Sequence, residues 1–248
     1  MELSLSGLLA HLLPLGCVVA ASFLQSLTGF GLAIVLAPLL MFFYDAKEVV
    51  TLVLLICVTG NLVQGVMHFR EADRRLVAFL FAGVVLGQPI GAWIFFALSS
   101  DTLKFCINAM VLASLLITHV THARFRETDV NAVKTGVLSG ITSATTGMGG
   151  PPFLLYMAHT KIAPEMLRAT CYVFFFFCNI TSLASHAIGG MSLAFVLTEY
   201  VYLLPGLAAG ILLGDALFPY LPKTWIRQSI NILLLVTSVI GMGEVLLK

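Results

Sequence analysis

Charged residues are scarce in this chain. Only 10% of its 248 residues are Asp, Glu, Lys or Arg, and the formal net charge is +1. A nearly neutral chain lacks the broad basic face that nucleic acid requires, so we expect no nucleic-acid partner. The longest polar stretch covers only residues 121–134, so we expect no soluble domain. No Lys or Arg precedes the first apolar stretch, so we expect no cleaved signal peptide.

Motifs for nucleotides and metals are also missing. The phosphate-binding pattern G-x-x-x-x-G-K-[ST] does not occur, so this chain is not expected to hydrolyse ATP by itself. No C-x-x-C and no Cys/His cluster with metal-ligand spacing is present. All five cysteines lie inside apolar stretches, where they are expected to be small buried residues: Cys17, Cys57, Cys106, Cys171 and Cys178. We predict no metal, no cofactor and no enzymatic activity.

Apolar residues make up 59% of the chain, and the mean hydropathy is +1.02. Water would drive such a chain to aggregate, so its solvent is expected to be a lipid bilayer. A membrane-spanning helix needs about 20 apolar residues. The sequence therefore predicts an all-α, multi-pass membrane protein with about eight segments, at residues 7–43, 49–69, 76–98, 102–120, 135–158, 169–188, 192–217 and 226–247.

The chain contains an internal duplication. Thr28-Gly29-Phe30-Gly31 recurs 118 positions later as Thr146-Gly147-Met148-Gly149. Further pairs are Asn61 with Asn179 and His68 with His186 at the same offset, and Gly83, Gly87 and Gly91 with Gly206, Gly210 and Gly214 at an offset of 123. We predict two membrane repeats, 1–120 and 135–248, joined by a polar cytoplasmic linker at 121–134. The glycine ladders are expected to pack helices within one chain, with a homodimer interface as the lesser alternative.

Positive charges alternate between the repeats. Arg70, Arg74 and Arg75 follow the second stretch, whereas the equivalent break at Gly189-Gly190 carries no charge. Lys and Arg mark the cytoplasmic side, so the bias predicts two repeats of inverted topology. Basic residues flank 135–158 at both ends, which predicts that this segment enters and returns as two short half-helices. Residues 17–43 are expected to form the matching hairpin from the opposite face.

The two glycine-rich breaks are the first candidates for a substrate site. A helix interrupted inside the membrane leaves free amides and a partial positive charge at its new N-terminus, which favours an anion. Glycine lets an oxyanion approach the backbone, and threonine hydroxyls are potential donors. The candidates are Thr28, Gly29 and Gly31 in the first repeat, and Thr145, Thr146, Gly147, Gly149 and Gly150 in the second.

Polar side chains inside the apolar stretches form a second group of candidates. Amides are costly in a membrane unless they are bonded, so they are expected either to join helices or to contact substrate. These candidates are Asn61, Gln64, Asn179 and Ser182, with Gln25 and Gln88 as weaker ones. His186 is a candidate proton-sensitive group and Arg168 a vestibule or topology residue. The acids Glu199 and Asp215 are expected at membrane edges or partly solvated helix ends.

The motifs resemble those of the sulfite exporter TauE/SafE family. The resemblance is carried by T-G-F-G-L-A near the N-terminus, by T-G-M-G-G-P-P-F in the second repeat and by the small-residue run Ser139-Gly140-Ile141-Thr142-Ser143 before it. It covers about residues 16 to 243. The resemblance implies an integral inner-membrane permease for small anions, chiefly sulfite and organosulfonates.

Together these patterns predict a secondary transporter that exports a small sulfur oxyanion by alternating access around a midplane site between the repeats. Because acids are scarce within the spans, we expect the membrane potential alone to drive efflux. Uptake of a sulfonate or another small acid is the first alternative. A remote alternative is an intramembrane hydrolase that uses Ser139 and His186, although Ser139 lacks a repeat equivalent, since Ala21 occupies that position.

Overall fold

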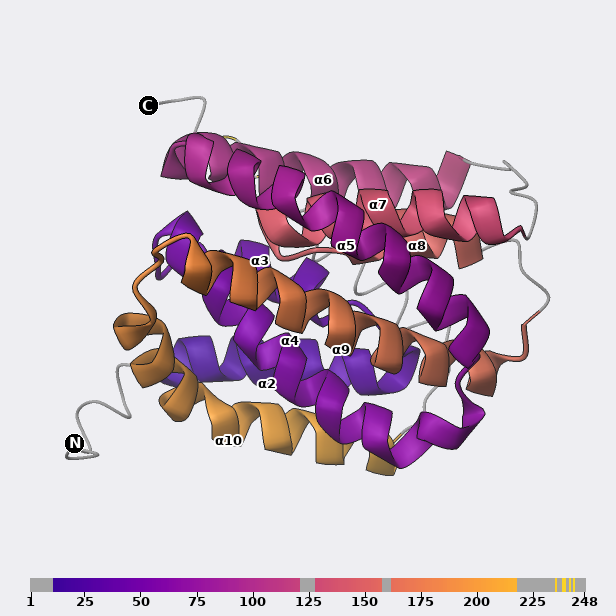
Figure 1. Ribbon diagram of the computed structural model, residues 1–248. Helices are drawn as coiled ribbons and strands as arrows, with labels where there is room; N and C mark the ends of the chain where they lie inside the picture. The colour runs from indigo at the N-terminus through magenta and orange to yellow at the C-terminus, as the bar shows by residue number, and fades with distance from the viewer. Residues whose placement is uncertain are drawn as a thin grey trace.

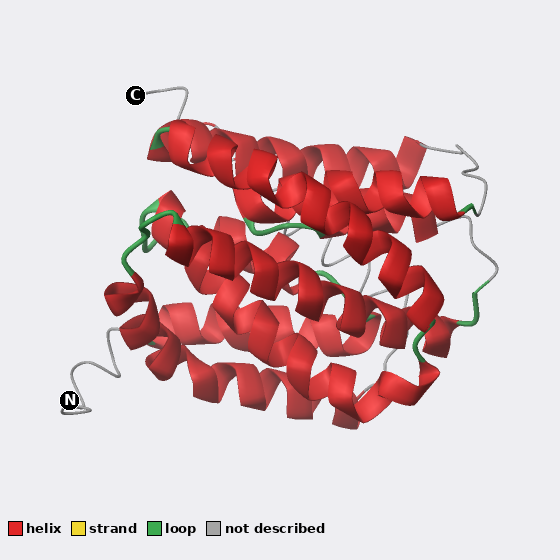
Figure 2. Ribbon diagram, in the orientation of Figure 1, coloured by secondary structure: helices red, strands yellow, loops and turns green. Residues whose placement is uncertain are grey.

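The computed structural model describes residues 11–120, 128–157 and 162–217, together with residues 235, 238, 239, 241 and 243. Within these ranges the chain is helical and contains no strand (Figure 2). The elements are α2 (Leu12–Thr28), α3 (Leu32–Leu40), α4 (Ala46–His68), the 3-10 turn η1 (Phe69–Glu71), α5 (Arg74–Ala97), α6 (Ser100–Val120), α7 (Asp129–Thr146), α8 (Gly150–Met157), α9 (Pro164–Ile188) and α10 (Leu193–Leu217).

Four of the described helices are long and apolar enough to cross a membrane. They cover Ala46–Glu71, Arg74–Ala97, Glu165–Ile188 and Leu193–Leu217. This confirms that the described part of the chain is all-helical and contains helices of membrane-spanning length. The total of eight segments stays a prediction, because most of the predicted stretch 226–247 lies outside the described residues.

Polar caps define where several helices begin. Asp45 accepts a hydrogen bond from the Lys47 amide at 2.9 Å and starts α4, and Asp73 accepts one from the Leu76 amide at 3.0 Å and starts α5. Thr128 accepts one from the Asn131 amide at 3.3 Å. Because that cap starts α7 at Asp129, residues 129–134 of the predicted linker are helical.

The two repeats are interleaved. The most extensive contacts join α5 to α7 and α10 to α2, so the fourth helix of each repeat packs on the first helix of the other (Figure 1). The glycine ladders make this possible, since a methyl group on Gly87 would lie 2.2 Å from the Val137 carbonyl oxygen. A methyl group on Gly210 would lie 2.5 Å from the Val19 carbonyl oxygen. Val19 and Val137 are themselves 118 positions apart, so both the ladders and their partners follow the duplication, as expected for packing within one chain.

Each broken helix pair returns to the end of the bundle where it began. The His11 ring, which precedes α2, lies 3.5 Å from the Tyr44 hydroxyl, which follows α3. In the second repeat, Asp129 at the start of α7 and Tyr156 near the end of α8 line the same pocket. The hairpin shape therefore agrees with the sequence-based expectation.

The arms of these hairpins are unequal, which corrects the expectation of two short half-helices. The first arms, α2 and α7, have 17 and 18 residues, whereas the second arms, α3 and α8, have 9 and 8. At about 1.5 Å per residue, a first arm is about 26 Å long and crosses most of a hydrocarbon core of about 30 Å. The physical reason in the second repeat is that α7 begins at Asp129, six residues before the apolar stretch.

Candidate functional site

The site begins with the two helix breaks, and both are confirmed. Gly29 and Gly147 end α2 and α7 with φ values of 84° and 75°, and Gly31 follows at 102°. Their amides close the last turns, from Gly29 to the Gln25 oxygen at 2.7 Å and from Gly147 to the Ser143 oxygen at 2.9 Å. Glycine is required there because other residues rarely adopt this left-handed conformation.

The short helices that follow the breaks begin close to each other. A methyl group on Gly150, the first residue of α8, would lie 3.4 Å from Cδ1 of Ile34 in the first turn of α3. The same methyl would lie 3.9 Å from the Phe175 ring of α9. The starts of the two short helices, one from each repeat, are therefore joined by a side-chain contact in the buried part of the bundle. Their free amides and partial positive charges make this the region best suited to an anion.

A buried polar cluster lies behind the start of α3. The Gln25 amide nitrogen donates to Asn61 Oδ1 at 2.7 Å, and the Gln64 amide nitrogen donates to the Ser26 hydroxyl at 2.9 Å. All four side chains are at most 2% exposed. Gln25 Oε1 lies 3.3 Å from the position of a methyl on Gly60, and Leu32 lies 3.9 Å from the same point. The first repeat thus places amide groups next to its half-helix.

The second repeat builds an equivalent cluster behind the start of α8. The Ser143 hydroxyl donates to Asn179 Oδ1 at 3.3 Å and lies 2.8 Å from the Ser182 hydroxyl. The Gln88 amide nitrogen donates to Ser182 at 2.8 Å. A methyl on Gly149 would lie 3.3 Å from Cβ of Ser143. The bonded pair Ser143–Asn179 and the pair Gln25–Asn61 are related by the offset of 118, so the duplication extends to the hydrogen bonds.

Two members of these clusters were not singled out from the sequence. Ser26 and Ser143 carry short hydroxyls, which look ordinary in a run of small residues. The offset itself held the signal for Ser143, because it lies 118 positions after Gln25, which was a weak candidate. Ser26 corresponds to Ala144 by the same offset, so the repeat comparison gives no signal for it.

The predicted threonine donors are engaged with the backbone. Thr146 donates to the Thr142 carbonyl at 2.8 Å, and Thr145 donates to the Ile141 carbonyl at 2.8 Å or the Gly91 carbonyl at 3.1 Å. Thr28 bonds the Leu24 and Phe30 carbonyls at 2.8 and 2.6 Å. In this arrangement these hydroxyls stabilise the ends of the first arms, and their contact with substrate stays a prediction.

Arg168 and His186 bond the ends of the two long arms. Arg168 Nη2 donates to the Ser26 carbonyl at 2.8 Å, and His186 Nε2 lies 2.7 Å from the Ala144 carbonyl, which is the repeat equivalent of Ser26. A basic side chain suits a helix C-terminus, where free carbonyls carry partial negative charge. Arg168 also packs against Gly29, whereas its repeat equivalent Val50 packs beside Gly147.

His186 is completely buried and has both ring nitrogens engaged. Nδ1 lies 3.2 Å from the Thr51 hydroxyl, and the ring stacks on Phe95 with centroids 3.9 Å apart. Because a carbonyl only accepts, Nε2 carries the proton toward Ala144. Ser139 is also buried, but its hydroxyl has no hydrogen-bond partner within the described residues. The structure does not form the Ser139–His186 dyad that a hydrolase would need.

Glu199 is more buried than the sequence indicated. Its residue is only 7% exposed, and Oε2 accepts a hydrogen bond from the Tyr44 hydroxyl at 2.7 Å. The His11 ring lies 3.2 Å from the same oxygen. Burial, and then the Glu199 carboxylate, raise the pKa of Tyr44. Asp215 differs, since it lies exposed near the end of α10 and accepts a hydrogen bond from Ser26 at 2.5 Å.

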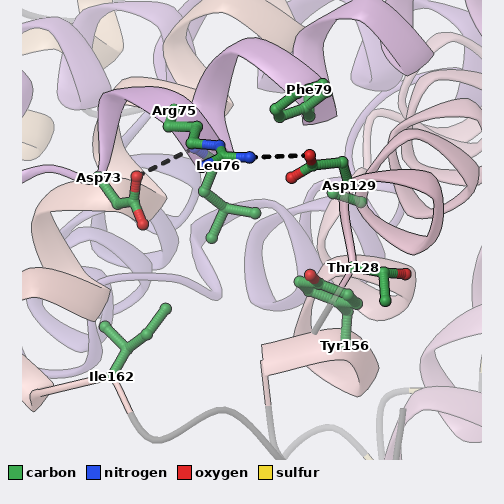
Figure 3. Close-up of a pocket in the computed structure, with 9 residues that line it drawn as sticks. Asp73, Arg75, Leu76, Phe79, Thr128, Asp129, Tyr156 and Ile162 are labelled. Carbon is green, nitrogen blue, oxygen red and sulfur yellow. Dashed lines mark hydrogen bonds and ion pairs between the residues drawn. The ribbon is translucent and has the colours of Figure 1, made fainter. Parts of the chain in front are cut away.

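A surface pocket of about 160 Å³ has no residue from the half-helix starts in its lining (Figure 3). It is lined by residues from the starts of α5 and α7, the end of α8 and the segment before α9: Asp73, Arg75, Leu76, Phe79, Thr128, Asp129, Ala132, Tyr156 and Ile162. Arg75 pairs with Asp129 at 2.9 Å. Two carboxylates and one guanidinium do not favour an anion, so we do not assign the substrate site to this pocket.

A duplicated helical bundle with apolar spans and two broken helices is typical of integral membrane transporters. The family model described as Sulfite exporter TauE/SafE matches residues 14–240. The chain belongs to this family of membrane transporters, which confirms the resemblance seen in its motifs. No curated protein and no solved structure matches the chain.

Proposed function

We propose that this protein is a secondary transporter that exports a small sulfur oxyanion, sulfite or an organosulfonate, across the cell inner membrane. The observation that carries the proposal is the meeting of the α3 and α8 N-termini, where Ile34 and Gly150 come together from opposite repeats. A site between two repeats is one that alternating access can expose to each side in turn.

The chemistry of this centre fits an oxyanion. Helix N-termini present backbone amides and a partial positive charge, and Gly149 and Gly150 keep that backbone free of side chains. The amides of Asn61 and Asn179 lie in clusters next to the two helix starts and supply further polar groups. The binding region would therefore attract a small anion without requiring a buried cation at its centre.

The distribution of basic residues supports inverted repeats. The end of the bundle that holds the starts of α5, α7 and α9 carries five described basic residues, Arg70, Arg74, Arg75, Lys134 and Arg168. The opposite end, where α4 and α6 begin, carries Lys47 and Lys104. By the positive-inside rule the first end faces the cytoplasm. The α7–α8 hairpin then opens toward the cytoplasm and the α2–α3 hairpin toward the other side.

Export is favoured by the membrane potential. An anion that leaves a cell with a negative interior gains about 2.3 kcal/mol per charge for each 100 mV. The interleaved packing of α5 on α7 and α10 on α2 provides two similar units that can rock against the α4–α9 centre. The membrane potential would therefore set the direction of transport and also drive it, without a second energy source.

Ligand binding to the purified protein tests this proposal. We expect sulfite or a short sulfonate to raise the unfolding temperature, since a ligand at 100 times its Kd stabilises by about 2.7 kcal/mol. For Asn179→Leu we expect that at least ten times more ligand is needed to give the same rise in unfolding temperature, because the substitution removes an amide beside the α8 start. Thr198→Val is the matched control, since Thr198 is exposed on α10 and its hydroxyl bonds only the Ala194 carbonyl of its own helix among the described residues.

Two results would contradict the proposal. The first is stabilisation by acetate but by neither sulfite nor a sulfonate, which would assign another cargo. The second is an equal shift in the wild type and in Asn179→Leu, which would place binding elsewhere. Efflux of the stabilising anion from proteoliposomes then distinguishes export from uptake.

A further inference from the structure

The two ends of the bundle differ at positions that the duplication makes equivalent. Four of the residues that line the pocket near the starts of α5 and α7 are Leu76, Phe79, Asp129 and Ile162. Their equivalents at the other end are, in the same order, Glu199, Tyr202, His11 and Tyr44. At one end these positions line an open pocket of about 160 Å³, and at the other they are in contact with one another.

The bonded group, which we call the His–Glu cluster, joins three segments of the chain. His11 precedes α2, Tyr44 lies between α3 and α4, and Glu199 lies in α10. Tyr44 and His11 both contact Glu199 Oε2, at 2.7 and 3.2 Å. The His11 ring also stacks on Tyr202, with centroids 4.6 Å apart. These contacts hold α10, α2 and the α3–α4 turn together at this end.

The charge of the His–Glu cluster depends on a proton. With His11 protonated, the pair is neutral overall and forms a buried ion pair. Without that proton, the Glu199 carboxylate has only neutral hydrogen-bond donors. Its side chain is only 9% exposed, and an uncompensated buried charge is costly. Histidine is the side chain whose charge changes between pH 5 and 8.

Two other ionisable groups lie around the cluster, and one of them acts in the same direction. Among the described residues, Glu48 of α4 interacts electrostatically with Glu199, and Cys17 of α2 interacts with Tyr44. Glu48 adds a second negative charge and therefore disfavours the deprotonated pair further. No described basic side chain forms an ion pair with Glu199 other than His11.

We propose that His11 and Glu199 form a proton-binding site that closes the non-cytoplasmic end of the bundle when occupied and releases it when empty. The identification of this end as non-cytoplasmic rests on the proposed function. External protons would then slow transport, and loss of the proton would loosen the start of α10 from the start of α2 and from the α3–α4 turn, while the glycine ladder keeps the rest of α10 packed on α2. The neutral equivalents Leu76 and Ile162 leave the cytoplasmic end without such a control.

Spin labels on Leu13 and Leu197 test the site without any knowledge of the substrate. Both side chains are exposed, at 71% and 50%, and they lie on α2 and α10. We expect the separation of the labels to lengthen between pH 6 and pH 8 in the wild type. Glu199→Gln is expected to keep the short separation at both pH values, because its cluster cannot carry a net negative charge.

His11→Gln provides the opposite prediction and serves if Glu199→Gln does not fold. It leaves Glu199 without a proton-dependent partner, so the long separation is expected at both pH values. Glu71→Gln is the matched control, since it removes the exposed His68–Glu71 pair at the other end and should behave as the wild type. Equal separations at pH 6 and pH 8 in the wild type, or a pH response that persists in Glu199→Gln, would overturn the proposal.

Anion efflux measured on the same proteoliposomes separates the two proposals. A pH-dependent separation with no efflux of sulfite or sulfonate would retain the proton site and reject the proposed cargo. Efflux that is insensitive to pH, with a constant separation, would retain the cargo and reject the proton site.

Discussion

At the scale of single residues, the glycines of the first break have different surroundings. Gly29 and Gly31 both have positive φ, but only Gly29 is in close contact with another helix. A methyl group there would lie 2.9 Å from Cγ and 3.1 Å from Cα of Arg168. Around Gly31 nothing lies within 4 Å of such a methyl. Gly31 is therefore required only for its backbone conformation, whereas Gly29 also allows α9 to pack closely.

This difference predicts unequal effects of the same substitution. Gly31→Ala should lower the free energy of unfolding by about 1–2 kcal/mol, the usual cost of a left-handed alanine. Gly29→Ala should cost more, because the Arg168 backbone must also move. Unfolding by titration with sodium dodecyl sulfate in micelles measures both. Equal losses would show that the Arg168 contact does not limit the break.

Single residues also show where sequence reasoning stops. The repeat offset predicted that Asn61 and Asn179 have equivalent positions, and the structure gives them equivalent partners in Gln25 and Ser143. It did not predict the contact of Arg168 with Ser26, because this contact joins residues 142 positions apart and Val50 takes the equivalent place in the other repeat. A feature present in one repeat alone cannot be found by comparing the two.

At the scale of elements, the packing of α5 on α7 and of α10 on α2 depends on small residues. The ladders were visible in the sequence because glycines recur every four residues, on one face of a helix. The partner helices could not be predicted in this way, because a glycine ladder indicates that another helix packs closely but does not identify that helix. The unequal arms of the hairpins were not predicted for another reason. The polar residues 129–134 favoured a linker, but the Thr128 side chain caps a helix that begins at Asp129.

Substitution within a ladder should separate the helices. Gly87→Ala would place a methyl 2.2 Å from the Val137 oxygen, and we expect a loss of about 1–3 kcal/mol in the free energy of unfolding. Gly210→Ala should cost a similar amount, by the duplication. Gly16→Ala is the matched control, because nothing lies within 4 Å of its methyl, and it should be neutral or stabilising. A neutral Gly87→Ala would refute the close contact.

At the scale of the whole molecule, the main prediction concerns the two faces. Cysteines placed singly at Thr128 and Ile162, in a chain without the native cysteines, should react with an impermeant maleimide only after the cells are opened. Cysteines at Ser99 and Ser192 should react in intact cells. The reason is the excess of basic residues at the end that holds the starts of α5, α7 and α9. Labelling of Thr128 and Ser192 from the same side would exclude inverted repeats.

The interleaving of the repeats has a consequence for biogenesis. While the ribosome has made only the first repeat, the ladder of α5 has no α7 to pack on, and α2 has no α10. Both helices must wait in the bilayer with their glycine faces against lipid until residues 129–217 have been inserted. Neither repeat can therefore complete its native packing alone, and the protein reaches its fold only after the second half of the chain has left the ribosome.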